Sequence, residues 1–155
     1  MKKINIKIVL LLICLVLIDF ISKLLIINYL KNDFIIINNF LKFSYIKNTG
    51  AAFGIMGDST IVLIVVTLIF IYYIIREMRA NKLNKLSMYS YTLILGGALG
   101  NLIDRIFRGY VVDFISFTIF NKEMAIFNVA DILITIGIVL YVIDLIGDKN
   151  ERSNS

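Results

Sequence analysis

The chain has 155 residues, of which 59% are hydrophobic, well above the roughly 45–50% of a soluble domain, so a soluble globular protein is excluded. Histidine is absent and Cys14 is the single cysteine, which excludes Ser–His and Cys–His catalytic groups, an intrachain disulfide and a multi-cysteine metal site. The net charge of +5 comes from basic residues that border apolar runs, so it indicates membrane topology signals and no nucleic-acid partner.

Four apolar runs predict the membrane-spanning helices of a single domain, residues 1–148, followed by a charged cytoplasmic tail at 149–155. The predicted helices cover residues 8–27, 60–75, 86–103 and 129–146. The first run resembles a signal peptide, but it is long and no small-residue cleavage site follows it, so we interpret it as a retained helix. Cys14 lies within this run, where we expect a small buried hydrophobic residue.

The stretches between the helices predict a small β element. Residues Phe34–Ile37 and 40–46 are bounded by Asn-rich turns and predict two short strands. An aromatic-rich stretch at 107–127 contains a third predicted strand at 111–117. The expected fold class is therefore a membrane all-α protein with four transmembrane helices and a short β cradle.

Basic residues set the expected orientation in the membrane. Three basic segments, at residues 2–7, 76–85 and 149–152, fall on one side of the four-helix topology. Because positively charged loops favour the cytoplasmic side, both termini are expected in the cytoplasm. The β cradle then lies on the extracytoplasmic face.

Asp19 and Lys23 are four residues apart and share one face of the first predicted helix. Charged groups within a membrane span are costly, so each needs a partner. The pair has two interpretations. It is either an ion pair that locks helices together or an electrostatic support for a site near the outer interface.

The third predicted helix carries small and polar residues toward its outer end. Gly96 and Gly100 form a GxxxG face that favours close helix packing. Asn101 and Arg105 share another face, with Asp104 alongside, and Arg105 can hold a carboxylate or phosphate with two parallel hydrogen bonds. The alternative is an Arg105–Asp104 surface group at a helix end.

Asp113 and Asp131 are the candidate catalytic residues. Asp113 lies in an apolar strand, where a carboxylate needs a polar partner. Asp131 shares a face with Asn128 in the first turn of the fourth helix, where the helix dipole favours an anion. Two neighbouring carboxyl groups tend to share one proton, so one can activate water while the other hydrogen-bonds a scissile carbonyl. The same acids also suit proton or ion transport.

Five segments together resemble the lipoprotein signal peptidase family of bacteria, also called signal peptidase II. In chain order they are DFISK at 19–23, NTGAAFG at 48–54, GGALGNLIDR at 96–105, VVDF at 111–114 and FNVAD at 127–131. Each segment alone is a weak signal, but all five occur in the family order. The chain length and the four-helix layout also match.

The resemblance implies an intramembrane aspartyl endopeptidase of the bacterial cytoplasmic membrane without a metal or organic cofactor. Nothing in the sequence requires more than a monomer. It implies cleavage of diacylglyceryl-modified prolipoproteins just before the lipidated cysteine, contact with membrane lipid, and inhibition by cyclic peptide antibiotics such as globomycin. Asp113 and Asp131 are the catalytic pair by this resemblance. The residues expected to line or support the site are Asp19, Lys23, Asn48, Gly50, Asn101, Asp104, Arg105, Asn128 and Ala130.

Two other functions suit a small polytopic membrane protein. A proton- or ion-coupled transporter predicts acids spread through the membrane depth and an internal repeat, whereas here the acids gather near the outer end and no repeat is visible. A non-enzymatic assembly factor would use the GxxxG face but leaves Asp113, Asn128 and Asp131 without a role. The motif set therefore favours the peptidase.

Overall fold

The computed structural model describes residues 5–50, 60–80, 83–120 and 122–153. Within them the helices are α1 (Ile6–Tyr29), α2 (Thr60–Ala80), α3 (Lys85–Arg108) and α4 (Val129–Ser153). The strands are β1 (Phe34–Ile37), β2 (Leu41–Asn48), β3 (Val111–Ile119) and β4 (Lys122–Phe127). Each helix contains a segment long and apolar enough to cross a membrane.

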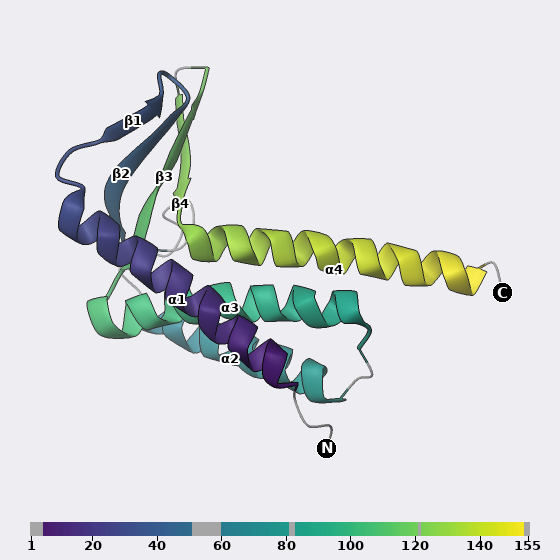
Figure 1. The fold of residues 1–155 in the computed structure, drawn as a ribbon. Helices are drawn as coiled ribbons and strands as arrows, with labels where there is room; N and C mark the ends of the chain where they lie inside the picture. The colour runs from purple at the N-terminus through teal and green to yellow at the C-terminus, as the bar shows by residue number, and fades with distance from the viewer. Residues whose placement is uncertain (1–4, 51–59, 81–82, 121, 154–155) are drawn as a thin grey trace.

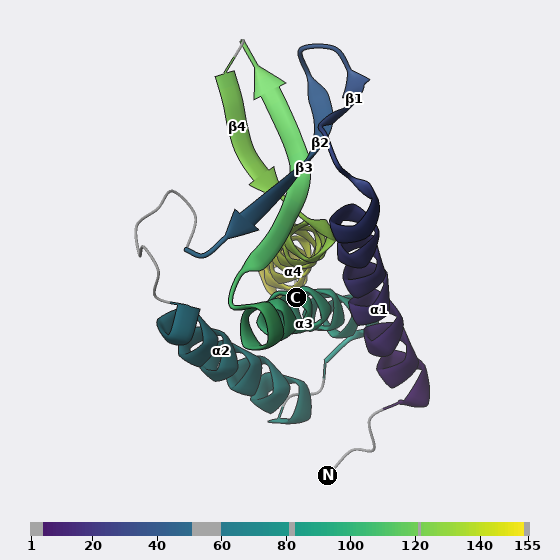
Figure 2. The same ribbon diagram turned by 90° about the vertical axis from the view of Figure 1, so that its left-hand side faces the viewer.

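Helix α3 is the centre of the bundle, and α1, α2 and α4 each pack against it (Figure 2). A far larger share of α3 is buried than of the other three spans, although it is the least apolar of the four. Protein rather than lipid surrounds α3, so its polar side chains can find partners there. Its apolar side chains, such as Ile94 and Leu95, pack against Ile71 and Ile74 of α2.

The four strands form one antiparallel sheet in the order β1-β2-β3-β4. Figure 1 shows this sheet at the end of the bundle where α1 and α3 finish and α4 begins, projecting across the helix axes. The start of α1 and the end of α4 both lie at the opposite end of the bundle (Figure 1). Val112 and Phe114 of β3 pack against Ile26 of α1, which joins the base of the sheet to the helices.

The elements differ from the predicted ones mainly at their ends. The strand Phe34–Ile37 is confirmed, and the two other predicted strands lie within one or two residues of β2 and β3, but β4 was not predicted. Helices α2, α3 and α4 continue past their apolar runs, as far as Ala80, Arg108 and Ser153. Helical hydrogen bonding depends on the backbone and therefore continues through polar residues. Residues 104 and 105 consequently lie inside α3, and 149–153 inside α4.

The prediction that Cys14 is buried is wrong, because its side chain is exposed on the outside of α1. The buried face of α1 instead carries Leu15, Asp19, Lys23 and Ile26. Cys14 lies on the outer surface of the bundle with exposed apolar neighbours such as Ile13, a surface suited to lipid.

Glycines set how closely the helices approach α3. A Cβ atom built on Gly96 would lie 3.1 Å from Leu15 Cβ, and one built on Gly100 would lie 2.5 Å from the carboxylate oxygen Oδ2 of Asp19. The predicted GxxxG face is therefore confirmed as the contact between α3 and α1. A Cβ on Gly97 would collide with the carbonyl oxygen of Ala130, so the next face of α3 packs equally closely on α4.

Gly100→Ala is expected to destabilise the protein by about 1–3 kcal/mol, because the added methyl group displaces the buried Asp19 carboxylate. The measurement is thermal unfolding of the protein in detergent. Gly147→Ala on α4 is the matched control, since a Cβ there meets nothing within 4 Å. Equal loss of stability in both variants would contradict this packing argument.

Candidate functional site

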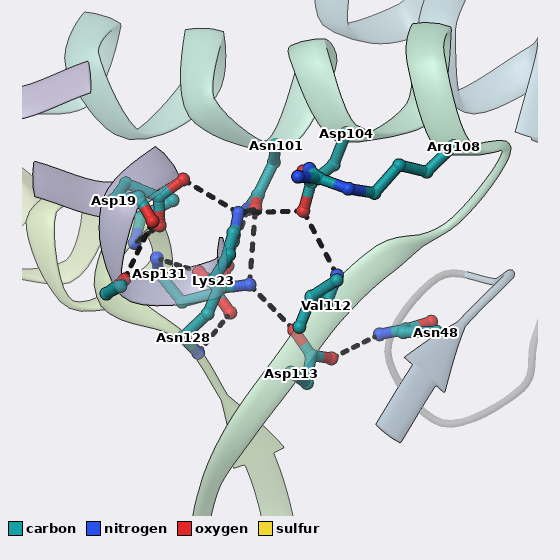
Figure 3. Close-up of polar contacts among 12 residues, drawn as sticks. Asp19, Lys23, Asn48, Asn101, Asp104, Arg108, Val112, Asp113, Asn128 and Asp131 are labelled. Atoms are coloured by element: carbon teal, nitrogen blue, oxygen red, sulfur yellow. Dashed lines mark hydrogen bonds and ion pairs between the residues drawn. The ribbon is translucent and has the colours of Figure 1, made fainter. Parts of the chain in front are cut away.

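The polar residues of the chain meet where the base of the sheet joins the helices (Figure 3). The helices α1 and α3, the strands β2 and β3, and the junction between β4 and α4 all contribute acidic, amine or amide side chains to this site. These side chains are Asp19, Lys23, Asn48, Asn101, Asp104, Asp113, Asn128 and Asp131. Segments far apart in the sequence thus build one continuous network.

Asp113 is buried in β3 and is held by two side-chain amides. Asn128 Nδ2 donates a hydrogen bond to its Oδ1 at 2.7 Å, and Asn48 Nδ2 donates to its Oδ2 at 2.8 Å. The Asn48 carbonyl oxygen in turn accepts from the backbone N–H of Gly50 at 3.1 Å, which orients the amide. The partner expected for a carboxylate in this apolar strand is therefore a pair of asparagines.

Burial raises the pKa of Asp113 to about 6, because removal from water disfavours the charged carboxylate. The negative charge of Asp131 raises this pKa further. Hydrogen bonds from Asn48 and Asn128 oppose the shift, since they stabilise the ionised form. Asp113 can therefore carry or release a proton near neutral pH.

Asp131 lies in the first turn of α4 and forms a reciprocal cap with Asn128. The backbone N–H of Asn128 donates to Asp131 Oδ2 at 3.2 Å, and the backbone N–H of Asp131 donates to Asn128 Oδ1 at 3.0 Å. Asn101 Nδ2 of α3 donates to the other oxygen, Oδ1, at 2.8 Å. The predicted place of Asp131 in the first turn of the fourth helix is thus confirmed, and Asn101 of α3 holds its carboxyl group as well. Asn128 contacts both carboxyl groups and fixes their relative placement.

Lys23 is completely buried and binds three acceptors from two helices. Its ammonium nitrogen lies 2.7 Å from Asp19 Oδ2, 3.1 Å from Asp104 Oδ2 and 3.0 Å from Asn101 Oδ1. The interpretation of the Asp19–Lys23 pair as an ion pair that links helices is therefore confirmed. The pair joins α1 to α3, and it also orients the Asn101 amide that holds Asp131.

Asp19 and Asp104 each hold a backbone N–H group beside a candidate catalytic residue. Asp19 Oδ1 accepts from the N–H of Ala130 at 2.8 Å, directly before Asp131. Asp104 Oδ2 accepts from the N–H of Val112 at 3.1 Å, directly before Asp113. The buried acids thus position the start of α4 and the start of β3.

The alternative of an Arg105–Asp104 surface group is wrong, because Asp104 is buried and forms ion pairs with Lys23 and Arg108. Residues four apart on a helix share a face, whereas neighbours point in different directions, so Arg108 and not Arg105 reaches Asp104. The role of Arg108 was missed, although its spacing from Asp104 is a visible signal. Arg105 is half-buried, and its side chain makes no hydrogen bond or ion pair within the described ranges. The charges of Asp131 and Asp113 still act on its guanidinium.

Residues 51–54, the rest of the segment that begins at Asn48, lie outside the described residues. In the part of the chain that the structure describes, no three His, Cys, Asp or Glu side chains are arranged to hold a metal ion. The site therefore contains two carboxyl groups, a buried one from Asp113 and a half-buried one from Asp131, both held by amides at one end of the four membrane-spanning segments.

A family model described as signal peptidase (SPase) II matches residues 11–147. The lipoprotein signal peptidase of Clostridium tetani is 42% identical over 135 residues, which cover 84% of this chain and 86% of that protein. The lipoprotein signal peptidase of Caldanaerobacter subterraneus subsp. tengcongensis is 43% identical over 129 residues, which cover 81% of this chain and 86% of that protein.

Two solved structures, each described as a bacterial membrane enzyme determined by the in meso method, share the fold. The first has a TM-score of 0.87 and 32% sequence identity and covers 97% of this chain and 93% of its own. The second has a TM-score of 0.83 and 33% sequence identity, and the match covers 93% of this chain and 95% of the second structure's chain. Four apolar spans and these membrane-enzyme neighbours make the chain a multi-pass membrane protein. It belongs to the signal peptidase II family, whose members are proteases that cleave the signal peptides of prolipoproteins.

Proposed function

We propose that this chain is an aspartyl endopeptidase of the bacterial cytoplasmic membrane. It removes the signal peptide from diacylglyceryl-modified prolipoproteins by cutting just before the lipidated cysteine. The observation that carries this proposal is the pair Asp113 and Asp131, two carboxyl groups linked through Asn128 at the end of the membrane spans. A transporter would need acids through the membrane depth, whereas Asp19, Asp104, Asp113 and Asp131 all gather at the sheet end.

The site suits this substrate because a signal peptide is itself an apolar helix with its cleavage point near the outer surface. We place both termini in the cytoplasm and the sheet on the extracytoplasmic face, following the basic segments. The substrate helix then lies beside the bundle in contact with membrane lipid, and its scissile bond reaches the junction of sheet and helices, where water has access. A monomer contains every proposed catalytic group.

We assign the two proton-transfer roles from the surroundings of each carboxyl group. Asp131 is the ionised member, because it accepts N–H bonds from Asn101 and Asn128 at the positive end of α4. Asp113 is the protonated member, because burial raises its pKa to about 6 and the charge of Asp131 adds to this shift. A substrate that excludes water from the site favours the protonated form further.

Cleavage then proceeds in two steps, each with two proton transfers. Asp131 takes a proton from water as the water oxygen bonds to the scissile carbonyl carbon, and Asp113 gives its proton to the carbonyl oxygen. The resulting tetrahedral diol loses a proton to Asp113 as its carbonyl re-forms, while the proton on Asp131 passes to the amide nitrogen. The C–N bond breaks, which leaves a carboxyl group on the signal peptide and an amine on the lipidated cysteine.

Cleavage of a defined substrate tests this function directly. The purified protein in detergent receives a diacylglyceryl-modified prolipoprotein or the same prolipoprotein without the lipid, and mass spectrometry locates any cut. We expect a single cut before the modified cysteine, little reaction without the lipid, and inhibition by globomycin. No cleavage of the modified substrate would contradict the function, and equal cleavage of both would contradict the lipid requirement.

Asn48→Ala is expected to move the alkaline limb of the pH–rate profile to higher pH. The Asn48 N–H bond lowers the pKa of Asp113, so its loss raises that pKa further above the ordinary value. Asp113 acts in its protonated form, so activity is lost as pH rises through this pKa and persists to higher pH in the variant. The measurement is kcat/KM against pH, which reports the free enzyme. The control is Asn38→Ala, because Asn38 lies in an exposed turn. If the alkaline limb of Asn48→Ala stays in place or moves to lower pH, Asp113 is not the protonated catalytic group.

A further inference from the structure

The last residue of α3, Arg108, is tied to the buried network although no segment of the family resemblance includes it. Its guanidinium forms an ion pair with Asp104 one helical turn earlier, and only 16% of its side chain is exposed. The guanidinium carbon also lies 5.4 Å from the centre of the Phe20 ring on α1, a cation–π distance. Arg108 is therefore held on two sides, by Asp104 of α3 (Figure 3) and by Phe20 of α1.

The charge of Arg108 balances the charges of its buried neighbours Asp19, Lys23 and Asp104. Asp19, Lys23 and Asp104 are almost fully buried and together carry one excess negative charge. Arg108 supplies the missing positive charge on the second oxygen of Asp104. A buried charge without compensation is strongly unfavourable, so loss of Arg108 forces Asp104 to take up a proton, move, or draw Lys23 toward itself.

Asp104 connects this charge to β3. The carboxylate oxygen Oδ2 accepts the N–H of Val112, and Asp113 is the next residue. Between Arg108 and β3 stand only Gly109, which has the left-handed φ of 78° and ends the helix, and Tyr110. The direction of β3 after the end of α3 therefore depends on the Asp104 carboxylate, which forms the ion pair with Arg108.

We propose that Arg108 is a positioning residue that fixes Asp113 through Asp104 and the backbone of Val112. This inference rests on the proposed function for its kinetic consequence. A simpler interpretation is that a cation at the end of a helix only stabilises the helix dipole. That interpretation predicts some loss of stability, but neither a change in turnover nor a dependence on Asp104.

Arg108→Gln is expected to lower kcat by about 10- to 100-fold with KM unchanged, because a small displacement of a reacting group mainly affects the transition state. Arg108→Lys keeps the charge and is expected to recover most of the activity. Arg79→Gln is the matched control, since Arg79 also lies in the last turn of a helix, at the other end of the bundle. A kcat for Arg108→Gln equal to that of the control would overturn the proposal.

A double-variant cycle separates positioning from helix stabilisation. Among the buried charged side chains around Asp104, Asp104→Asn leaves one excess positive charge and Arg108→Gln leaves one excess negative charge. The double variant has no excess charge in this group. The amide oxygen of the asparagine at position 104 can still accept the Val112 N–H. The double variant is therefore expected to be at least as active and as stable as Arg108→Gln alone. This holds even if Arg108→Gln does not fold. Additive losses would overturn the proposal.

Hydrogen exchange tests the link to β3 without any substrate. Faster exchange is expected in a peptide covering residues 109–117 of Arg108→Gln than in the wild type or Arg79→Gln. Unchanged protection of this peptide would overturn the positioning role even in an active enzyme. Absence of wild-type cleavage together with increased exchange would instead reject the proposed function and leave the Arg108 link standing.

Discussion

Asp113→Asn and Asp131→Asn are each expected to lower the cleavage rate by about 100- to 10,000-fold, because each removes one of the two proton-transfer groups. An asparagine at position 131 cannot take a proton from water, and one at 113 cannot give a proton to the carbonyl oxygen. The measurement is turnover of the diacylglyceryl-modified prolipoprotein by purified variants. Both losses should appear in kcat, since both groups act on the reacting atoms.

The matched control for these variants is Asp33→Asn. Asp33 is also an acid near the sheet, but it is exposed and forms its ion pair with Lys42, away from the buried network. We expect it to retain wild-type turnover. Circular dichroism and thermal unfolding establish that each variant is folded. A folded Asp113→Asn or Asp131→Asn protein that cleaves at the wild-type rate would exclude the carboxyl pair as the catalytic machinery.

Lys23→Met is expected to destabilise the protein by about 3–5 kcal/mol, because it leaves the buried carboxylates of Asp19 and Asp104 without their shared cation. Activity is expected to fall as well, since Lys23 orients the Asn101 amide that holds Asp131. The measurement is the free energy of unfolding in detergent.

Lys42 provides a natural comparison for Lys23. Lys42 also bridges two carboxylates, those of Asp33 and Glu123, but all three side chains are substantially exposed on the sheet. Lys42→Met is therefore expected to cost only about 0–1 kcal/mol. The same bridging geometry thus differs in strength because water solvates one set of charges and not the other.

Addition of Asp19→Asn to Lys23→Met provides a further check on the role of charge. It leaves Asp104 balanced by Arg108 alone, and an asparagine oxygen can still accept the Ala130 N–H. We expect this double variant to be more stable than Lys23→Met alone. If it is less stable, packing of the lysine chain rather than charge balance explains its burial.

The sequence by itself determined the architecture and the set of polar residues. Long apolar runs predict spans because a membrane requires them, so four helices and three of the four strands follow from composition and pattern. Polar side chains are rare in such a chain, and those without an evident structural role stand out. For this reason seven of the eight side chains of the network can be identified from the residues themselves, whereas Asn48 is indicated only by the family resemblance.

Only the tertiary structure decided which of these residues meet and which helix faces are inward. In a soluble helix the apolar stripe marks the buried face, but lipid is as apolar as the protein interior, so this contrast is lost in a membrane. That is why the sequence predicts Cys14 inside the bundle, whereas it lies outside. It is also why the sequence leaves an Arg105–Asp104 surface group as an alternative, whereas in the structure Asp104 forms ion pairs with Lys23 of α1 and with Arg108. The carboxyl pair itself depends on Asn48 and Asn128, which come from different elements, so its geometry exists only in the folded chain.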